Sequence, residues 1–309
     1  MLKFVLKRLG YMVIVMFIVT TITFFLVHSI PGDPISAMVQ DLPEETREVY
    51  LAKYGFDQPV YIQYINFMKQ LLTGDLGASL RYPGRNVIDI VKNYAPVSGT
   101  VGGLALAIGF TIGIIFGIIA ALKRNQWPDK VIMFVAILGT TIPTFVTAAV
   151  LQYTLTVTWP IFPTTGWGDP KHMVLPVICM TVGPITTYAR YMRSSVLDVA
   201  NQDYILTAEA KGTSQFKIVT RHMFRNSFLP CITMICTSIA NIFSGSFIVE
   251  SIYAIPGLGK YFISAINDRD YAVVLGLNII ITGVYILSML ICDILMAMID
   301  PRIRLSDDN

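Results

Sequence analysis

Few residues in this 309-residue chain are arranged to do chemistry. The stretch closest to a phosphate-binding loop is Pro256-Gly257-Leu258-Gly259-Lys260, and a complete loop of that kind would bind ATP. This stretch lacks the upstream glycine, and Tyr261 stands where the loop requires serine or threonine. We therefore expect the chain to bind no ATP and no other cofactor of its own.

Other catalytic and metal-binding patterns are missing from the sequence. It contains no H-E-x-x-H, no G-x-S-x-G and no C-x-x-C, and its three histidines, His28, His172 and His222, stand far apart. The four cysteines fall in apolar runs, where cysteine usually serves as a small buried hydrophobe. We predict no catalytic residue, no metal site and no enzymatic activity for this chain.

Two acidic residues, Glu250 and Asp293, lie within or near the ends of apolar runs. A charge in hydrocarbon costs at least about 2.5–3.5 kcal/mol, so such residues are functional by default. Each is nevertheless close enough to one end of its run to reach water. The threonines around Pro143 are equally open to two interpretations. Thr140, Thr141 and Thr144 could line a polar cavity, or they could hydrogen-bond to backbone groups that the proline leaves without a helical partner.

The composition of the chain is that of a membrane protein. The chain is 54% hydrophobic and 14% charged, with a mean hydropathy of +0.62, whereas soluble proteins carry roughly 25% charged residues. A soluble enzyme and a disordered chain are both excluded. The net charge of +3 gives no support for a nucleic-acid partner.

Apolar runs of the length needed to cross a bilayer, roughly 20 residues, occur six times. The fourth is the shortest and contains Pro176 and Pro184. The runs lack the alternation of barrel strands, so we predict an all-α polytopic membrane protein with six transmembrane helices. The runs are residues 9–30, 97–122, 131–157, 174–191, 228–252 and 271–299.

Lysine and arginine are denser in segments 1–8, 123–130, 190–227 and 300–309 than in the segments between them. Because positive charge marks the cytoplasmic side, we expect both termini to be cytoplasmic. The first run is too long for a cleaved signal peptide and is interpreted as a retained helix. The outer segment 31–95 is mildly acidic and is expected either to contact another protein or to be solvated.

The inner segment 193–227 is too long for a simple turn. We predict two short helices, 195–211 and 214–226, separated at Gly212, because glycine commonly follows the end of a helix. The second helix has a basic and an apolar stripe, so it should lie on the membrane face or on a partner protein. The basic stripe consists of Lys217, Arg221 and Arg225, and the apolar stripe of Phe216, Val219 and Met223.

The run 203–212, D-Y-I-L-T-A-E-A-K-G, followed by Arg221-His222 and by the stretch 225–230, resembles the EAA-type coupling loop of ABC importer permeases. It is most similar to the oligopeptide/dipeptide/nickel branch, and within it to the B-type permease of oligopeptide systems. Segments 31–34, 86–96, 250–259, 267–271 and 299–302 also match, so the resemblance covers essentially the whole chain. One departure is Leu206, which stands where many importers have a charged residue.

The resemblance implies a type I ABC importer transmembrane domain at 94–299, preceded by a first helix and outer segment at 1–93 and followed by a cytoplasmic tail at 300–309. It implies that the loop 193–227 docks on an ATPase and transmits its closure. The coupling residues would be Thr207, Ala208, Ala210, Lys211, Gly212, Phe216, Arg221 and Pro230.

The stretch 250–270 is predicted to form an external gate, because proline and glycine interrupt a helical pattern at membrane depth. An ordinary extracellular loop is the alternative. The candidate gate residues are Glu250, Pro256, Gly257, Gly259, Arg269 and Asp270.

The resemblance also implies partners in a bacterial inner or plasma membrane. These are a second homologous permease, one or two cytoplasmic ATPases that carry ATP and Mg²⁺, and an extracellular or periplasmic solute-binding protein. The substrate would be an oligopeptide or dipeptide. A nickel or metal-chelate importer of the same family, and a membrane receptor or scaffold without transport, remain alternatives.

Overall fold

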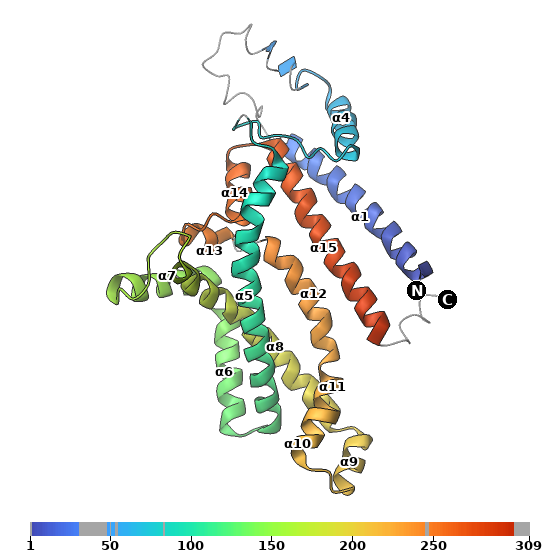
Figure 1. Ribbon diagram of the computed structural model, residues 1–309, viewed down its shortest axis with the longest axis vertical. Coiled ribbons are helices and arrows are strands. Elements are labelled where there is room, and N and C mark those ends of the chain that lie inside the picture. Colours follow the sequence, from blue (N-terminus) through green and yellow to red (C-terminus); the bar gives the residue numbers. More distant parts are fainter. Residues whose placement is uncertain are drawn as a thin grey trace.

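The computed structural model describes residues 2–30, 48–49, 51–52, 55–82, 84–244 and 247–299. The predicted tail 300–309 and the turn 31–34 lie outside these residues. The described elements are helical, as expected, and the long helices form a bundle in which they lie roughly along one direction (Figure 1). Within the described residues, extended pairing is limited to one isolated bridge between Ala78 and Asn86. The predicted all-α class is confirmed.

The longer helices are α1 (Leu2–His28), α4 (Val60–Leu72), α5 (Val87–Leu122), α6 (Trp127–Thr141), α8 (Pro170–Ala200), α12 (Leu229–Ser244) and α15 (Tyr271–Ile299). The shorter ones are α7 (Thr144–Gln152), α9 (Asp203–Ala210), α10 (Gln215–Lys217), α11 (Phe224–Ser227), α13 (Phe247–Ile252) and α14 (Leu258–Asn267). Two wide π-type segments, Tyr153–Thr158 and Ile218–Met223, continue α7 and α10.

Among the described residues, four helices are long and apolar enough to cross a membrane: Val5–His28, Val87–Leu122, Pro170–Ala200 and Tyr271–Met296. A fifth span arises if the bent pair Trp127–Thr141 and Thr144–Thr158 counts as one. The predicted run 228–252 is divided between α12 and α13, with two residues between them outside the described part. The count of six transmembrane helices stays a prediction.

The predicted span over 131–157 is broken near Pro143, because the chain bends by 97° between α6 and α7. Ile142 is extended at φ −80° and ψ 119°, and Pro143 precedes the first residue of α7. Proline disfavours helical geometry in the residue before it and has no N–H to donate. By contrast, Pro176 and Pro184 lie inside α8 without ending it.

A row of glycines on α5 lets α8 approach closely. A Cβ at Gly113 would lie 2.8 Å from the Cβ of Tyr188 and 2.8 Å from the carbonyl oxygen of Ile185. Small residues four apart are a common device for helix packing in membranes. These two helices therefore form the centre of the bundle, and the other close contacts of the row join Gly109 to Pro184 and Gly117 to Met192.

Helices α1 and α15 pack side by side (Figure 1). The Asn278 side chain donates to the Thr23 hydroxyl at 2.6 Å, and Arg8 pairs with Asp293 at 3.2 Å. Asp293 therefore has a structural partner on α1, which accounts for an acidic residue in this apolar helix.

The orientation can be tested by labelling with a membrane-impermeant thiol reagent. The four native cysteines are buried, so an introduced cysteine should dominate the signal. We expect Leu72→Cys, at a residue that is 84% exposed, to be labelled from outside intact cells, and Ser214→Cys to be labelled only after the cells are opened. The opposite pattern would place the termini outside and contradict the predicted topology.

Candidate functional site

The loop between α8 and α12, which the charge bias predicts to lie on the inner side and which we call the inner loop, is a folded unit at one end of the molecule (Figure 1). The first predicted loop helix, 195–211, is wrong in its bounds. Residues 195–200 belong to α8, which ends at the cap Asn201, and α9 covers only Asp203–Ala210. The apolar pattern did not predict this because polar side chains end the run near residue 191, while the backbone remains helical for nine more residues.

The side of this loop that faces α8 is apolar. Ile205 and Ile218 are buried in one cluster with Met192 and Val196 of α8. Ala208 and Met223 belong to the same cluster. The loop therefore packs on α8, and the two share one hydrophobic cluster.

The outward side of the loop exposes large apolar groups. Leu206 is 57% exposed and Phe216 is 76% exposed. The predicted stripe of Phe216, Val219 and Met223 is thus divided, because the wide turn Ile218–Met223 changes the helical period between them. Phe216 points away from the core and Met223 into it.

Gly212 ends α9 as the sequence predicts. Its N–H donates to the Glu209 carbonyl at 2.9 Å, and the Thr213 N–H donates to the Ala208 carbonyl at 3.1 Å. With a φ of +74° at Gly212, this is the Schellman arrangement, in which the residue after the cap is left-handed. Among the described residues, a Cβ at Gly212 would meet no atom within 4 Å, so only the backbone conformation favours glycine.

Polar contacts fix the loop to α8 and to its own second half. The hydroxyls of Ser195 and Ser227 donate to each other's carbonyl oxygens at 3.0 and 3.2 Å. The Asn226 amide donates to the Tyr204 hydroxyl at 2.8 Å, which joins α11 to α9. The motifs in the sequence include Tyr204, Asn226 and Ser227, but sequence reasoning predicted no contact for them and did not single out Ser195.

A second missed contact braces the same end of the bundle. Arg193 donates two hydrogen bonds to the carboxylate of Asp129, at 2.6 and 2.7 Å, and Asp129 is buried at the start of α6. This forked geometry is the strong form of an arginine–carboxylate pair. The pair holds α6 against α8 just before the loop begins.

The remaining predicted coupling residues lie on α9, the following turn, the wide turn and α12. The Thr207 hydroxyl donates to the Asp203 carbonyl within its own helix at 2.9 Å. Ala210, Lys211 and Arg221 are exposed. Pro230 lies in α12, and its side chain is outside the described part.

On the opposite side of the bundle, Glu250 is buried at 3% exposure and caps α14. Its carboxylate accepts from the Lys260 N–H at 2.8 Å and from the Ser98 hydroxyl at 2.7 Å. The Ser98 oxygen in turn accepts from the Leu258 N–H at 2.8 Å. A carboxylate at a helix N-terminus satisfies free N–H groups and complements the helix dipole. Glu250 therefore joins α13, α14 and α5.

Gly257 leaves room for the carboxylate of Glu250. A Cβ at Gly257 would lie 2.3 Å from Cδ of Glu250, closer than real contacts allow. Pro256 is half-buried and Gly259 is buried beside them. The structure therefore brings four of the six predicted gate residues into one cluster.

The other two, Arg269 and Asp270, lie at the far end of α14. Asp270 is buried and accepts from the Leu80 N–H at 3.0 Å and from the Ser79 hydroxyl. This contact fastens the outer segment to the start of α15. Arg269 is exposed and has a φ of +54°.

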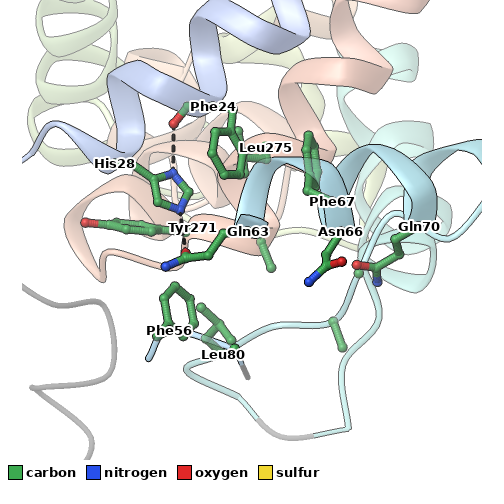
Figure 2. Close-up of a pocket in the computed structure, with 14 residues that line it drawn as sticks. Phe24, His28, Phe56, Gln63, Asn66, Phe67, Gln70, Leu80, Tyr271 and Leu275 are labelled. Carbon is green, nitrogen blue, oxygen red and sulfur yellow. Dashed lines mark hydrogen bonds between the residues drawn. The ribbon is translucent and has the colours of Figure 1, made fainter. Parts of the chain in front are cut away.

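Next to this contact is a cavity of about 330 Å³ between α1, α4 and α15. Figure 2 shows its aromatic and amide lining, with His28 between the Phe24 carbonyl, at 2.8 Å, and the side-chain oxygen of Gln63, at 3.2 Å. The bond between His28 and Gln63 ties α4 to α1, whereas the bond to the Phe24 carbonyl lies within α1. The described residues contain no group of three or more histidine, cysteine or acidic side chains suited to a metal ion.

Comparison with known proteins assigns the chain to a family. The model described as "Binding-protein-dependent transport system inner membrane component" matches residues 113–305, and the model of its N-terminal region matches residues 1–82. The chain is 40% identical over 305 residues to the dipeptide transport system permease protein DppB of Bacillus subtilis, covering 99% of both chains. It is 37% identical over 306 residues to the oligopeptide transport system permease protein OppB of Haemophilus influenzae, covering 98% of this chain and 100% of the relative.

Proposed function

The chain belongs to the family of inner membrane components of binding-protein-dependent transport systems, and we propose that it is a permease subunit of an ATP-driven peptide importer. It is a multi-pass inner membrane protein. The observation that carries the proposal is the similarity over nearly the full length to dipeptide and oligopeptide permeases. Those relatives favour a peptide over nickel or a metal chelate as substrate.

The inner loop is the proposed contact with the ATPase. Its buried face and the paired serines fix it to α8, while Leu206 and Phe216 project outward. Such exposed apolar groups beside basic residues suit insertion into a groove of another protein. A rigid link between this contact and α8 would let ATPase closure bias the bundle between conformations, since only differential contacts shift an equilibrium.

The permease is expected to work with further subunits. Alternating access needs a second bundle across an interface, so a homologous permease would complete the pathway. ATP and Mg²⁺ would be held by one or two cytoplasmic ATPases. A solute-binding protein would deliver the peptide on the outer side, where the segment 31–95 is a candidate contact.

The proposal is tested by reconstituting the chain in vesicles with and without its partners. We expect ATP-dependent uptake of a labelled dipeptide or tripeptide only when the second permease, the ATPases and the binding protein are all present. The purified chain alone should hydrolyse no ATP, because it lacks a phosphate-binding loop. A nickel chelate should compete poorly with the peptide.

Two results would contradict the proposal. Robust ATP hydrolysis by the purified chain would show that the assignment of ATP binding to partners is wrong. A complete complex that binds peptide without moving it across the membrane would favour a receptor or scaffold.

A further inference from the structure

A cavity of about 350 Å³ opens beside α6 and α8, and polar side chains line it. Thr140 comes from the end of α6, and the others follow one another along α8. Their positions, three or four residues apart, place them on one side of the helix. The α8 residues are Thr187, Arg190, Tyr191 and Ser194.

This polar side is unusual for a helix long and apolar enough to cross a membrane. Arg190, Tyr191 and Ser194 are exposed, and Tyr191 is 54% exposed. A charged side chain within a membrane span is costly, so it normally faces a water-filled cavity or a partner. This face of α8 is therefore suited to an aqueous pathway.

Arg190 differs from the other charges near the ends of the spans. Arg193, three residues later, is held by Asp129, and Arg8 is held by Asp293. Within the described part of the chain, no ion pair or hydrogen bond engages the Arg190 side chain. Its guanidinium is thus available to a ligand.

We propose that this cavity is a passing site for the carboxylate end of a short peptide on its way through the membrane. The planar guanidinium donates a fork of N–H groups that matches a carboxylate. The neighbouring hydroxyls can donate to or accept from the peptide's amide groups. The inference rests on the proposed transport function and names the group of the substrate that this chain recognises.

The site should be weak. Its one charge stands in an open cavity, and a pathway requires binding that is favourable enough to admit the substrate but weak enough to release it. The chemistry would also accept the phosphate of a lipid headgroup, so the test must separate peptide from lipid.

Uptake by the complete importer in vesicles gives the first measurement. Trialanine and its C-terminal amide are compared at saturating binding protein. We expect Arg190→Gln to lower uptake of trialanine by about tenfold, the effect of losing one charge-assisted contact, with little change for the amide. Arg190→Lys should be intermediate, because it keeps the charge without the fork. Arg124→Gln, which removes an exposed charge outside the cavity, is the matched control and should be unchanged.

Protection of an introduced thiol gives a second measurement that does not depend on the binding protein. Ser194→Cys places a thiol in the cavity, and the four native cysteines are buried. We expect trialanine to slow modification of this thiol by an anionic methanethiosulfonate and the amide to protect less. Adding Arg190→Gln should remove the difference between the two peptides.

The outcomes separate this inference from the proposed function. If the unsubstituted complex imports no peptide, the proposed function fails. Suppose that it imports trialanine, and that Arg190→Gln changes neither the ratio of trialanine uptake to amide uptake nor the protection of the thiol at position 194. In that case this inference alone is overturned. An effect of Arg190→Gln that requires anionic lipid, with the peptide preference unchanged, would assign Arg190 to a headgroup and also overturn it.

Discussion

Replacing Gly257 with alanine is expected to reduce peptide uptake to less than about a tenth of the unsubstituted level, since overpacking typically costs about 1–3 kcal/mol. The new Cβ would lie 2.3 Å from Cδ and 2.4 Å from one oxygen of Glu250. The carboxylate would have to move away from Ser98 and from the start of α14. A buried charged group that loses its partners costs more than an ordinary lost hydrogen bond.

The measurement is uptake in vesicles together with the amount of assembled complex and its ATP hydrolysis. If the cluster acts as an outer gate, Gly257→Ala should assemble and hydrolyse ATP while uptake is lost. Adding Glu250→Asp shortens the opposing side chain by one methylene and should restore part of the transport. Gly283→Ala is the control, because among the described residues a Cβ at Gly283 meets no atom within 4 Å.

Two results would count against this interpretation. Full transport by Gly257→Ala would show that the close approach to Glu250 does not matter. Loss of assembly in step with loss of uptake would make the segment a folding element and would remove the gate hypothesis.

The sequence predicts the helical architecture because the length and apolar composition of each run are enough to indicate a membrane-spanning helix. Within the run at 131–157, Pro143 marks where the helix is interrupted, but composition does not predict the 97° bend found there. The end of α8 is misread. Arg193 looks like the start of a polar loop, yet its charge is neutralised by Asp129, 64 positions earlier.

The candidate site residues are identified by type, but their partners are set by tertiary contacts. Glu250 stands out as an acidic residue in an apolar run, whereas Ser98, its hydrogen-bond partner, is 152 positions away and unremarkable in sequence. Asp270 likewise meets Ser79 across 191 positions. One signal was available and unused, because the glycines at every fourth position of α5 already indicate a close helix contact.

The second large effect is expected at Gly212. Valine there would be strained at a φ of +74° by about 1–2 kcal/mol, because a left-handed conformation brings Cβ against the carbonyl. The surroundings are open, so the strain comes from the backbone alone. The chain can relieve it by changing the turn between α9 and α10, which would tilt the exposed Phe216 relative to α8. We expect Gly212→Val to insert and assemble but to hydrolyse ATP with little peptide-dependent stimulation or uptake.

The chain supplies two controls for this prediction. Gly212→Asn should be mild, because asparagine tolerates the left-handed region. Gly74, at φ +79°, ends α4 with the same pair of bonds, from Gly74 N–H to the Leu71 carbonyl and from Asp75 N–H to the Gln70 carbonyl. Helix α4 lies at the other end of the molecule from α9 (Figure 1). Gly74→Val therefore introduces the same strain away from the inner loop, and the number of peptides imported per ATP should stay the same. If Gly212→Val also leaves the number of peptides imported per ATP unchanged, the turn at Gly212 does not transmit ATPase closure. The coupling must then pass through the rigid contact of the loop with α8.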